Sequence, residues 1–432
     1  MKESKNLEDN MNVININEPI ITRNRIDYEY KIDGEWKKFF KEEHFYVEYN
    51  CNIESIPESI AIIPFICNIL PIAWLCNAVV NLKECDKSFY ESIPEVKKGF
   101  INMYPEFNFK GKINPEKLID NTNIQNNGSI AFFSGGVDAF DTLLRHINEK
   151  PIICTVWGAD VKIGNQKGWD NVEKNIKEVS NEYNLEYIIL KSNLRECFDN
   201  VELANLIKPL LDSYWYYFQH AIGMIGLVAP IDYLKGIGKN YFSSSYTEKD
   251  KNGPIPFRCG SDITIESYLK ICNAITIHDG YEFDRQGKVH NIVEYCRNNN
   301  KKVKLRVCWE SVASGKNCCK CEKCQRTMLE LYAEGVDPKN YGFNYTDVDL
   351  KNIKHCEGLY NEKNILRYYK PIQNAMKNNI KMEQLPNSLK WFYTLDLDKL
   401  ENRHTINSIK RKITKISNKI KKKLEKRDKY EQ

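Results

Sequence analysis

The chain has 432 residues, of which 42% are hydrophobic and 12% aromatic, so it holds enough apolar material for about two or three domains with buried cores. Its net charge of +5 is unevenly spread, because residues 404–432 carry eleven Lys and Arg against three Asp and Glu. The rest of the chain is therefore slightly acidic, which excludes a generally basic protein.

The fifteen cysteines bear on the compartment. Five of them crowd into residues 308–324 and the others are scattered through apolar segments, a pattern that favours free thiols in a reducing compartment over disulfides. The N-terminal segment MKESKNLEDNMNVININEP is polar and lacks the apolar core of a secretory signal. We therefore expect a cytoplasmic protein.

The first 125 residues contain no catalytic motif. Residues 1–22 are polar, and we expect them to be disordered. Residues 23–125 are expected to form a small α+β region, because IDYEYKID and HFYVEYN alternate apolar and polar side chains as half-buried strands do. Residues 85–107 then continue as an amphipathic helical segment.

One apolar run, from Ile60 to Val80, is long enough to span a membrane. It is interrupted by two prolines and two asparagines, whose polar groups would stay unpaired in lipid. We favour helices buried in a globular domain over the transmembrane alternative, and so expect no integral membrane span.

From Gly128 onwards, short apolar strands alternate with amphipathic helices. The strand candidates are IAFF, PIICTVW, EYIIL, NYFSSS and AITIH. Alternation at this spacing predicts an α/β fold with a mostly parallel, doubly wound sheet over residues 126–340. Ligands of such sheets bind at the carboxyl ends of the strands.

The strongest signal for a reaction is IAFFSGGVDAFDTLLRH, in which Ser134, Gly135 and Gly136 join an apolar run to a helix pattern. Glycines let the backbone approach a polyanion closely, Ser134 offers a hydroxyl, and the first helical amides present the positive end of the helix dipole. Asp138 could hold the loop's shape or a Mg²⁺ ion. The flanking strand and helix favour a phosphate-binding turn over a purely structural one.

The second signal is a set of four cysteines, Cys308, Cys318, Cys321 and Cys324, spaced C-x9-C-x2-C-x2-C. Four thiolates satisfy a structural Zn²⁺ and leave no position for water, so we expect this site to staple its loop and to perform no chemistry. Cys319 is the spare thiol. An iron–sulfur cluster and a redox-active pair are the alternatives for these soft ligands.

The two motifs, in this order and with a doubly wound pattern between them, resemble the N-type PP-loop ATP pyrophosphatases, most closely the 7-cyano-7-deazaguanine synthase family. SGGVDA stands where that superfamily has SGGxDS/T, so Ala139 replaces a hydroxyl and Thr142, one turn on, could partly substitute for it. The family's first cysteine spacer is one residue shorter, and its following Arg lies one residue further on than Arg326 does here. The resemblance covers residues 128–335, and it extends to synthase-like proteins with extra terminal regions.

The resemblance implies an adenine nucleotide alpha hydrolase-like fold and assigns roles to single residues. Asp138, Lys288 and Arg326 would be catalytic. Ser244, Gly260 and Ser261 would contact the acceptor substrate. The nucleotide would lie against two segments: Phe133, Ser134, Gly135, Gly136, Val137, Asp138 and Ala139, and then Val156, Trp157 and Gly158.

The activity that this resemblance implies is that of an ATP-dependent ligase. A carboxylate or amide of a small-molecule or peptide acceptor would become an adenylate with release of pyrophosphate, and ammonia or another nitrogen donor would displace AMP. ATP, Mg²⁺ and Zn²⁺ are the expected cofactors, and a homodimer is compatible with this activity. Two alternatives stay open: a sulfur-transfer or sulfonucleotide enzyme of the same fold, and a scaffold protein that binds nucleotide without turnover.

Two C-terminal segments follow. Residues 341–403 predict a helical region, and residues 404–432 predict a basic amphipathic helix, since Ile406, Ile409, Ile413, Ile416, Ile420 and Leu424 recur at spacings of three and four. Such a helix could contact an anionic membrane, RNA or a partner protein. A solvated or coiled-coil helix is the plainer interpretation.

Overall fold

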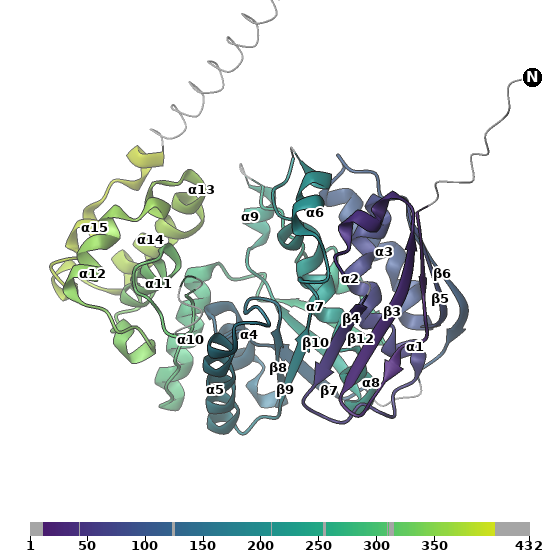
Figure 1. Ribbon diagram of the computed structural model, residues 1–432. Helices are drawn as coiled ribbons and strands as arrows, with labels where there is room; N and C mark the ends of the chain where they lie inside the picture. The colour runs from purple at the N-terminus through teal and green to yellow at the C-terminus, as the bar shows by residue number, and fades with distance from the viewer. Residues whose placement is uncertain are drawn as a thin grey trace, which may run out of the picture. The chain divides into compact units, whose positions relative to one another are not determined.

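The computed structural model describes residues 12–42, 44–122, 126–208, 210–253, 256–308, 310 and 315–401 (Figure 1). Its contacts divide the chain into two compact units. The first comprises Met1–Phe283 with Val312–Gly315, and the second comprises Asp284–Ser311 with Lys316–Gln432. The predicted N-terminal region and most of the predicted α/β region therefore belong to the same unit, whereas the four-cysteine motif belongs to the other.

Twelve strands of the described residues form one sheet in the first unit, in the order β11-β12-β10-β7-β8-β9-β4-β3-β1-β5-β6 with β2 on β3. They are β1 Val13–Ile16, β2 Ile20–Ile21, β3 Arg25–Asp33, β4 His44–Tyr49, β5 Val79–Asp86, β6 Lys112–Ile119, β7 Gly128–Phe132, β8 Ile152–Trp157, β9 Tyr187–Ser192, β10 Ile237–Ser243, β11 Lys270–Ile271 and β12 Ala274–Asp279.

The centre of this sheet is parallel, as the sequence predicts. Five neighbouring strands, β12, β10, β7, β8 and β9, run in the same direction. The chain passes outward from β7 through β8 to β9, and then returns to the other side of β7 as β10 and β12. The strand order therefore reverses between β7 and β10, where a doubly wound sheet has its topological switch point.

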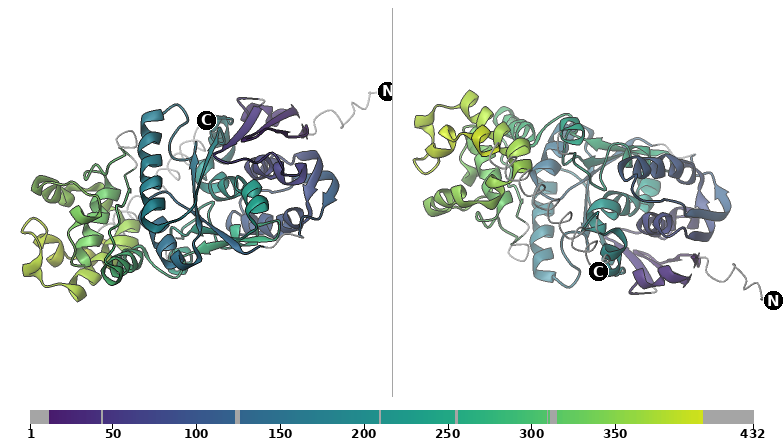
Figure 2. Two further views of the ribbon diagram at one scale, coloured as in Figure 1. Left: turned by 90° about the horizontal axis from the view of Figure 1, so that it is seen from below. Right: turned by 90° about the horizontal axis from the view of Figure 1, so that it is seen from above.

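Helices cover both faces of the parallel strands. Helix α4 contacts β7 and β10, α5 contacts β8 and β9, and α7 and α8 contact β10. Figures 1 and 2 show α5 on one side of these strands and α2 with α7 on the other. The helices of this unit are α1 Glu58–Ala61, α2 Ile63–Leu75, α3 Lys87–Met103, α4 Val137–Arg145, α5 Gln166–Tyr183, α6 Asn200–Ile207, the π-helical turn η3 Trp215–Gln219, α7 His220–Gly226, α8 Ala229–Lys235 and α9 Glu248–Asn252.

The apolar run after Pro57 folds into helix α2, in which every residue from Ile63 to Trp74 is buried. The Asn68 amide donates to the carbonyls of Pro64 (2.8 Å) and Gly223 (3.1 Å), so burial leaves it satisfied. A Cβ atom at Gly223 would lie 2.6 Å from Oδ1 of Asn68, which explains a glycine where α7 crosses α2. Within the described ranges, no helix combines the length and apolarity needed to cross a membrane.

The expectation of disorder over residues 1–22 is wrong for its second half. β1 lies between β3 and β5 and buries Ile14 and Ile16, and β2 pairs with β3. Two buried isoleucines and ladders on both sides outweigh the polar composition of this segment. Residues 1–11 lie outside the described part of the chain.

The described part of the second unit is helical and contains no strand. Buried side chains such as Met328, Leu331, Ile372, Met376 and Phe392 form its core. Its helices are α10 Arg285–Asn299, α11 Glu322–Ala333, α12 Asp347–Asn352, α13 Glu362–Asn364, α14 Lys370–Asn379 and α15 Lys390–Thr394, with short 3₁₀ and π turns between them. The predicted basic helix of residues 404–432 lies outside the described residues.

A buried carboxyl group makes the stability of the first unit depend on pH. Asp232 in α8 is fully buried and accepts one hydrogen bond, from Asn240 (2.9 Å). Burial raises the pKa of Asp232 well above its ordinary value. Its favourable contribution is therefore complete below the unfolded pKa of about 4 and is lost as the pH rises towards the folded pKa.

We predict that Asp232→Asn removes this fall in stability at higher pH. The free energy of unfolding of the variant minus that of the wild type should grow between pH 5 and pH 8, at up to about 1.4 kcal/mol per pH unit. Urea unfolding at several pH values measures this difference, with exposed Asp33→Asn as the control. A difference independent of pH would contradict the assignment of a neutral Asp232.

Candidate functional site

The turn after β7 has the backbone that the glycine motif predicts. Gly135 has a φ of +78°, a conformation that side-chain-bearing residues rarely adopt, and Gly136 precedes the first turn of α4. The N-cap residue Gly136 has no side chain with which to cap the start of α4. Ser134 is exposed and Asp138 is half-buried, whereas Ala139 is buried.

The carboxyl end of β10 lies beside this turn and holds α4 in place. The Ser243 hydroxyl donates to Oγ1 of Thr142 (3.0 Å), and Thr142 in turn hydrogen-bonds to Asp279. The Ser244 amide donates to the Asp279 carbonyl (2.7 Å). The Thr142 hydroxyl is thus hydrogen-bonded within the protein. In this arrangement it does not replace the hydroxyl that Ala139 lacks.

The last turn of α4 is clamped to the end of β12. Asp279 pairs with Arg145 and with Nε2 of His146 (2.8 Å), and the His146 ring stacks on Tyr241 with centroids 3.9 Å apart. Burial alone would raise the pKa of Asp279, but the hydrogen bond from His146 and the charge of Arg145 lower it. The clamp fixes the helix whose other end forms the glycine turn.

Sequence reasoning missed these clamp residues, although one signal was available. Arg145 and His146 close the helix pattern TLLRH, and Asp279 closes the strand pattern AITIHD. Charged side chains at the end of a buried helix and a buried strand require partners, but only the fold shows that they are one another's partners.

The second nucleotide-binding segment predicted from the sequence lies at the same edge of the sheet, on the neighbouring strand β8. Val156 and Trp157 end this strand, and Gly158 follows with a φ of +113°. A Cβ atom there would lie 2.0 Å from the Ser192 carbonyl oxygen, so only glycine fits. Trp157 stacks on Trp169 with centroids 4.9 Å apart, which makes this part of the edge rigid.

The three predicted acceptor contacts make internal hydrogen bonds. Ser244 is buried and donates to the Tyr246 carbonyl, and Ser261 donates to Oε1 of Glu266 (3.1 Å). The Gly260 amide donates to the Tyr216 carbonyl (2.8 Å). They lie in the first unit, where these bonds fix the loop after β10.

The remaining predicted catalytic residues, Lys288 and Arg326, belong to the second unit. Lys288 is buried on α10. Arg326 is buried on α11, with Nε 3.4 Å from Oε1 of Glu322 and the guanidinium carbon 3.6 Å from the centroid of the Tyr368 ring. Burial opposes the charge of Arg326, but Tyr368 and two glutamates, Glu330 and Glu322, outweigh it and raise its pKa. The side chain is thus held by three partners of its own unit.

The four cysteines of the second motif come together as predicted. Their Sγ atoms all lie within 4.8 Å of one another, and the pairs Cys308–Cys321 and Cys318–Cys324 are 3.9 Å apart. Zn–S bonds of about 2.3 Å give a tetrahedron with edges of about 3.8 Å, so this donor set fits a zinc ion. The group could hold a metal.

The local backbone explains why the thiols converge. The amides of Lys320 and Cys321 point at Sγ of Cys318, at 3.4 and 3.2 Å. Cys321 precedes the first residue of α11, where the helix dipole favours thiolate. On the other side, the Asn317 side chain accepts from the Cys308 amide (3.3 Å). Cys319 makes no part of the cluster and is buried beside it.

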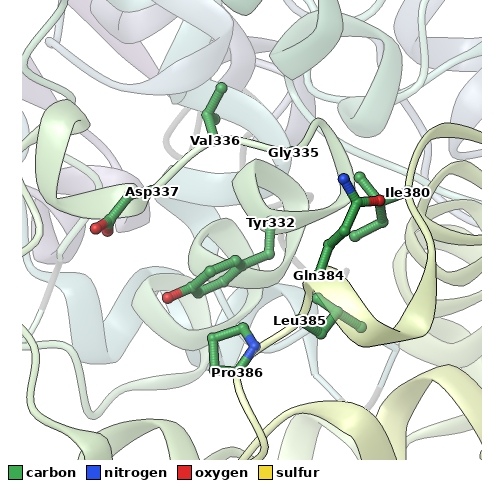
Figure 3. Close-up of a pocket in the computed structure, with 8 residues that line it drawn as sticks. All are labelled: Tyr332, Gly335, Val336, Asp337, Ile380, Gln384, Leu385 and Pro386. Carbon is green, nitrogen blue, oxygen red and sulfur yellow. The ribbon is translucent and has the colours of Figure 1, made fainter.

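The second unit also contains a cavity of about 470 Å³, shown in Figure 3. It is lined by Tyr332, Gly335, Val336, Asp337, Ile380, Gln384, Leu385 and Pro386. Tyr332 hydrogen-bonds to Tyr345, which donates to Asp337 (2.7 Å), so these polar groups are satisfied within the protein. None of the residues predicted to be functional lines it.

Comparison of the chain with protein-family models, with curated proteins and with solved structures found no match.

The clamp predicts a pH-dependent stability. Burial lowers the pKa of His146, but the hydrogen bond and charge of Asp279 outweigh it and raise the pKa above its ordinary value. The protonated ring thus contributes fully below the unfolded pKa of about 6.5, and its contribution is lost as the pH rises through the folded pKa. We expect His146→Asn to lower the free energy of unfolding by about 1–2 kcal/mol at pH 6 and by less at pH 8.5. Denaturant unfolding tests this against exposed His355→Asn, and a penalty that grew with pH would reverse the assignment.

The cysteine cluster predicts a bound metal that depends on four thiols and not on the fifth. Metal analysis of the purified protein should find one zinc ion per chain. Cys321→Ser should lose the zinc and lower the melting temperature. Cys319→Ser, at the neighbouring spare thiol, should keep the zinc and the wild-type melting temperature. Iron with visible absorbance would identify an iron–sulfur cluster instead.

Proposed function

We propose that this chain is an ATP pyrophosphatase of the PP-loop kind, similar to 7-cyano-7-deazaguanine synthase, which adenylates an acceptor and releases pyrophosphate. One observation supports the proposal most: the glycine turn at Ser134–Gly136 follows β7 at the point where the strand order reverses. Doubly wound sheets bind their ligands at this point, and an uncapped helix start favours a phosphate group there.

The turn would hold the polyphosphate through its backbone. The amides that begin α4 would donate to the leaving pyrophosphate, and the exposed Ser134 hydroxyl would add one hydrogen bond. Asp138, half-buried in the first turn, would hold Mg²⁺, which neutralises charge on the phosphates. Clamping α4 by Asp279 keeps these donors in place without reorganisation.

In the proposed reaction an acceptor oxygen attacks the α-phosphorus of ATP, and the bond to the pyrophosphate breaks. A nitrogen nucleophile then displaces AMP from the adenylate. Lys288 and Arg326 stay predicted stabilisers of the leaving group. Because Arg326 is already held by Glu322 and Tyr368, the proposal assigns most of this stabilisation to the amides of the turn.

A non-catalytic nucleotide-binding protein is the second candidate. It is favoured by Ala139, which removes a hydroxyl from the first turn of α4, and by Thr142, whose own hydroxyl is occupied by Ser243 and Asp279. Binding of ATP without release of pyrophosphate would distinguish this protein from the enzyme.

The sulfur-transfer alternative has less support, because it needs an activated thiol. Burial raises the pKa of every described cysteine in the first unit above its ordinary value: Cys51, Cys67, Cys76, Cys85, Cys154, Cys197, Cys259 and Cys272. Thiols of this kind are poor nucleophiles.

The proposal predicts that nucleotide affinity depends on Gly135. An alanine in the left-handed conformation costs about 1–2 kcal/mol, which corresponds to roughly tenfold in an equilibrium constant. Gly135→Ala should weaken ATP binding by about that factor in calorimetry and reduce pyrophosphate release similarly. Gly164→Ala is the matched control, because a Cβ atom there meets nothing within 4 Å.

Release of AMP and pyrophosphate should be followed with a panel of carboxylates, amino sugars and peptide termini as acceptors. The enzyme is supported if at least one acceptor stimulates both products. If ATP fails to bind the wild-type chain, or if the two glycine variants behave alike, the proposal is wrong.

A further inference from the structure

A second group of polar side chains lies at the same edge of the sheet and is unused by the proposed reaction. It consists of Asp160 after β8, Arg195 after β9, and Trp215 and His220 at the two sides of the π-helical turn that begins α7. These residues come from two loops and from the helical segment that leads into α7. No motif in the sequence joins them.

Arg195 is half-buried and has little to neutralise it. Its Nη1 donates to the Ala159 carbonyl (2.8 Å), and its guanidinium carbon lies 4.7 Å from the centroid of the Trp215 ring. Burial lowers the pKa of Arg195, and the charge of Asp160 only partly opposes this. Among the described residues no carboxylate forms an ion pair with it, so part of its hydrogen-bonding fork is available.

His220 contacts the same Trp215 ring. Its ring is edge-on to Trp215 and to Phe242, with both centroid distances at 5.6 Å. Its Nδ1 is buried and has no hydrogen-bond partner within the described ranges. A buried nitrogen of this kind normally has a partner, and a ligand atom would supply one.

This group belongs to the switch point between β7 and β10. Phe242 is the last residue but one of β10, and it contacts Phe132, the last residue of β7, at a centroid distance of 5.1 Å. Phe132 and Phe242 pack into the core that contains α2 and α7. Phe133, the next residue, contacts Phe140 on α4 instead. Because successive side chains of a strand point to opposite faces, Arg195 and His220 lie across the sheet edge from α4.

We propose that Arg195, assisted by His220, binds a carboxylate of the acceptor, on the side of the sheet edge opposite the turn assigned to the nucleotide's phosphates. Identifying the ligand as the acceptor rests on the proposed function, whereas the carboxylate subsite itself rests on the geometry of Arg195 and His220. A planar guanidinium forks onto a carboxylate, and the Trp215 ring beside Arg195 strengthens that bond by excluding water from one side.

The test uses the full chain and two probes of the same shape, benzoate and the uncharged benzamide. Binding is measured by calorimetry and by ligand-observed NMR, with and without α,β-methylene-ATP. Wild type should prefer benzoate. Arg195→Met should weaken benzoate binding by about tenfold or more and leave the affinity for benzamide and the nucleotide within about twofold. Arg258→Met, which removes an exposed charge elsewhere in the same unit, is the matched control.

Two further variants test the guanidinium fork and the imidazole separately. Arg195→Lys retains the charge but not the fork, so its benzoate affinity should lie between those of wild type and Arg195→Met. If Arg195→Met does not fold, the comparison of wild type with Arg195→Lys still tests the subsite. His220→Phe should preserve the aromatic packing and lose a smaller part of the benzoate affinity.

The outcomes separate the two proposals. Equal binding of benzoate and benzamide, or equal benzoate binding by wild type and Arg195→Lys, would overturn the carboxylate subsite. Displacement of benzoate by inorganic phosphate at similar concentration would also overturn it, in favour of a second phosphate site. If the nucleotide does not bind but benzoate does, and benzoate binding depends on Arg195, the proposed ATP pyrophosphatase is wrong and the carboxylate subsite is supported.

Discussion

The parallel pairing of β7 with β10 is the constraint on which the rest of the first unit depends. After β7 the chain continues towards one edge of the sheet, and after β10 it continues towards the other edge. Connections in opposite directions lie on opposite faces, so the carboxyl ends of these two strands stay uncovered between the two layers. The tight turn at Gly135 and the end of β10 at Ser243 therefore meet at one place. Thr142 and Asp279 then join α4, β10 and β12 into one rigid support.

The second unit follows a different physical logic. Its described part is built from short helices without a sheet, and its cysteine motif is held at the start of α11 by amides directed at sulfur. A metal with four thiolates would cross-link the segment around Cys308 to α11, which a core of short helices needs more than a sheet does. The contact between Arg326 on α11 and the Tyr368 ring serves the same end, because Tyr368 belongs to a different helical segment, Ile365–Tyr369.

How much of this could be read from sequence depended on the range of the interactions. The five parallel strands were predictable, because each is an apolar run between polar helices, and the cysteine cluster was predictable, because its spacing is local. β1 was missed, since two buried isoleucines among asparagines give too weak a local pattern. The clamp of Asp279 on Arg145 and the contact of Thr142 with Ser243 join positions more than a hundred residues apart, so no local pattern encodes them.

The same distinction bears on how the two proposed ligand sites at the sheet edge would divide the choice of substrate. On the α4 side the proposed phosphate ligands are backbone amides, which bind any phosphate and are insensitive to most substitutions. On the α7 side the available groups are side chains: among the described residues, the Arg195 guanidinium has no ion pair and one His220 ring nitrogen has no hydrogen bond. Side chains discriminate between ligands, because a wrong ligand leaves a buried charge unpaired. The two proposals therefore differ in their demands: the proposed nucleotide turn would persist without the hydroxyl that Ala139 lacks, whereas the proposed selection of an acceptor would be lost with Arg195.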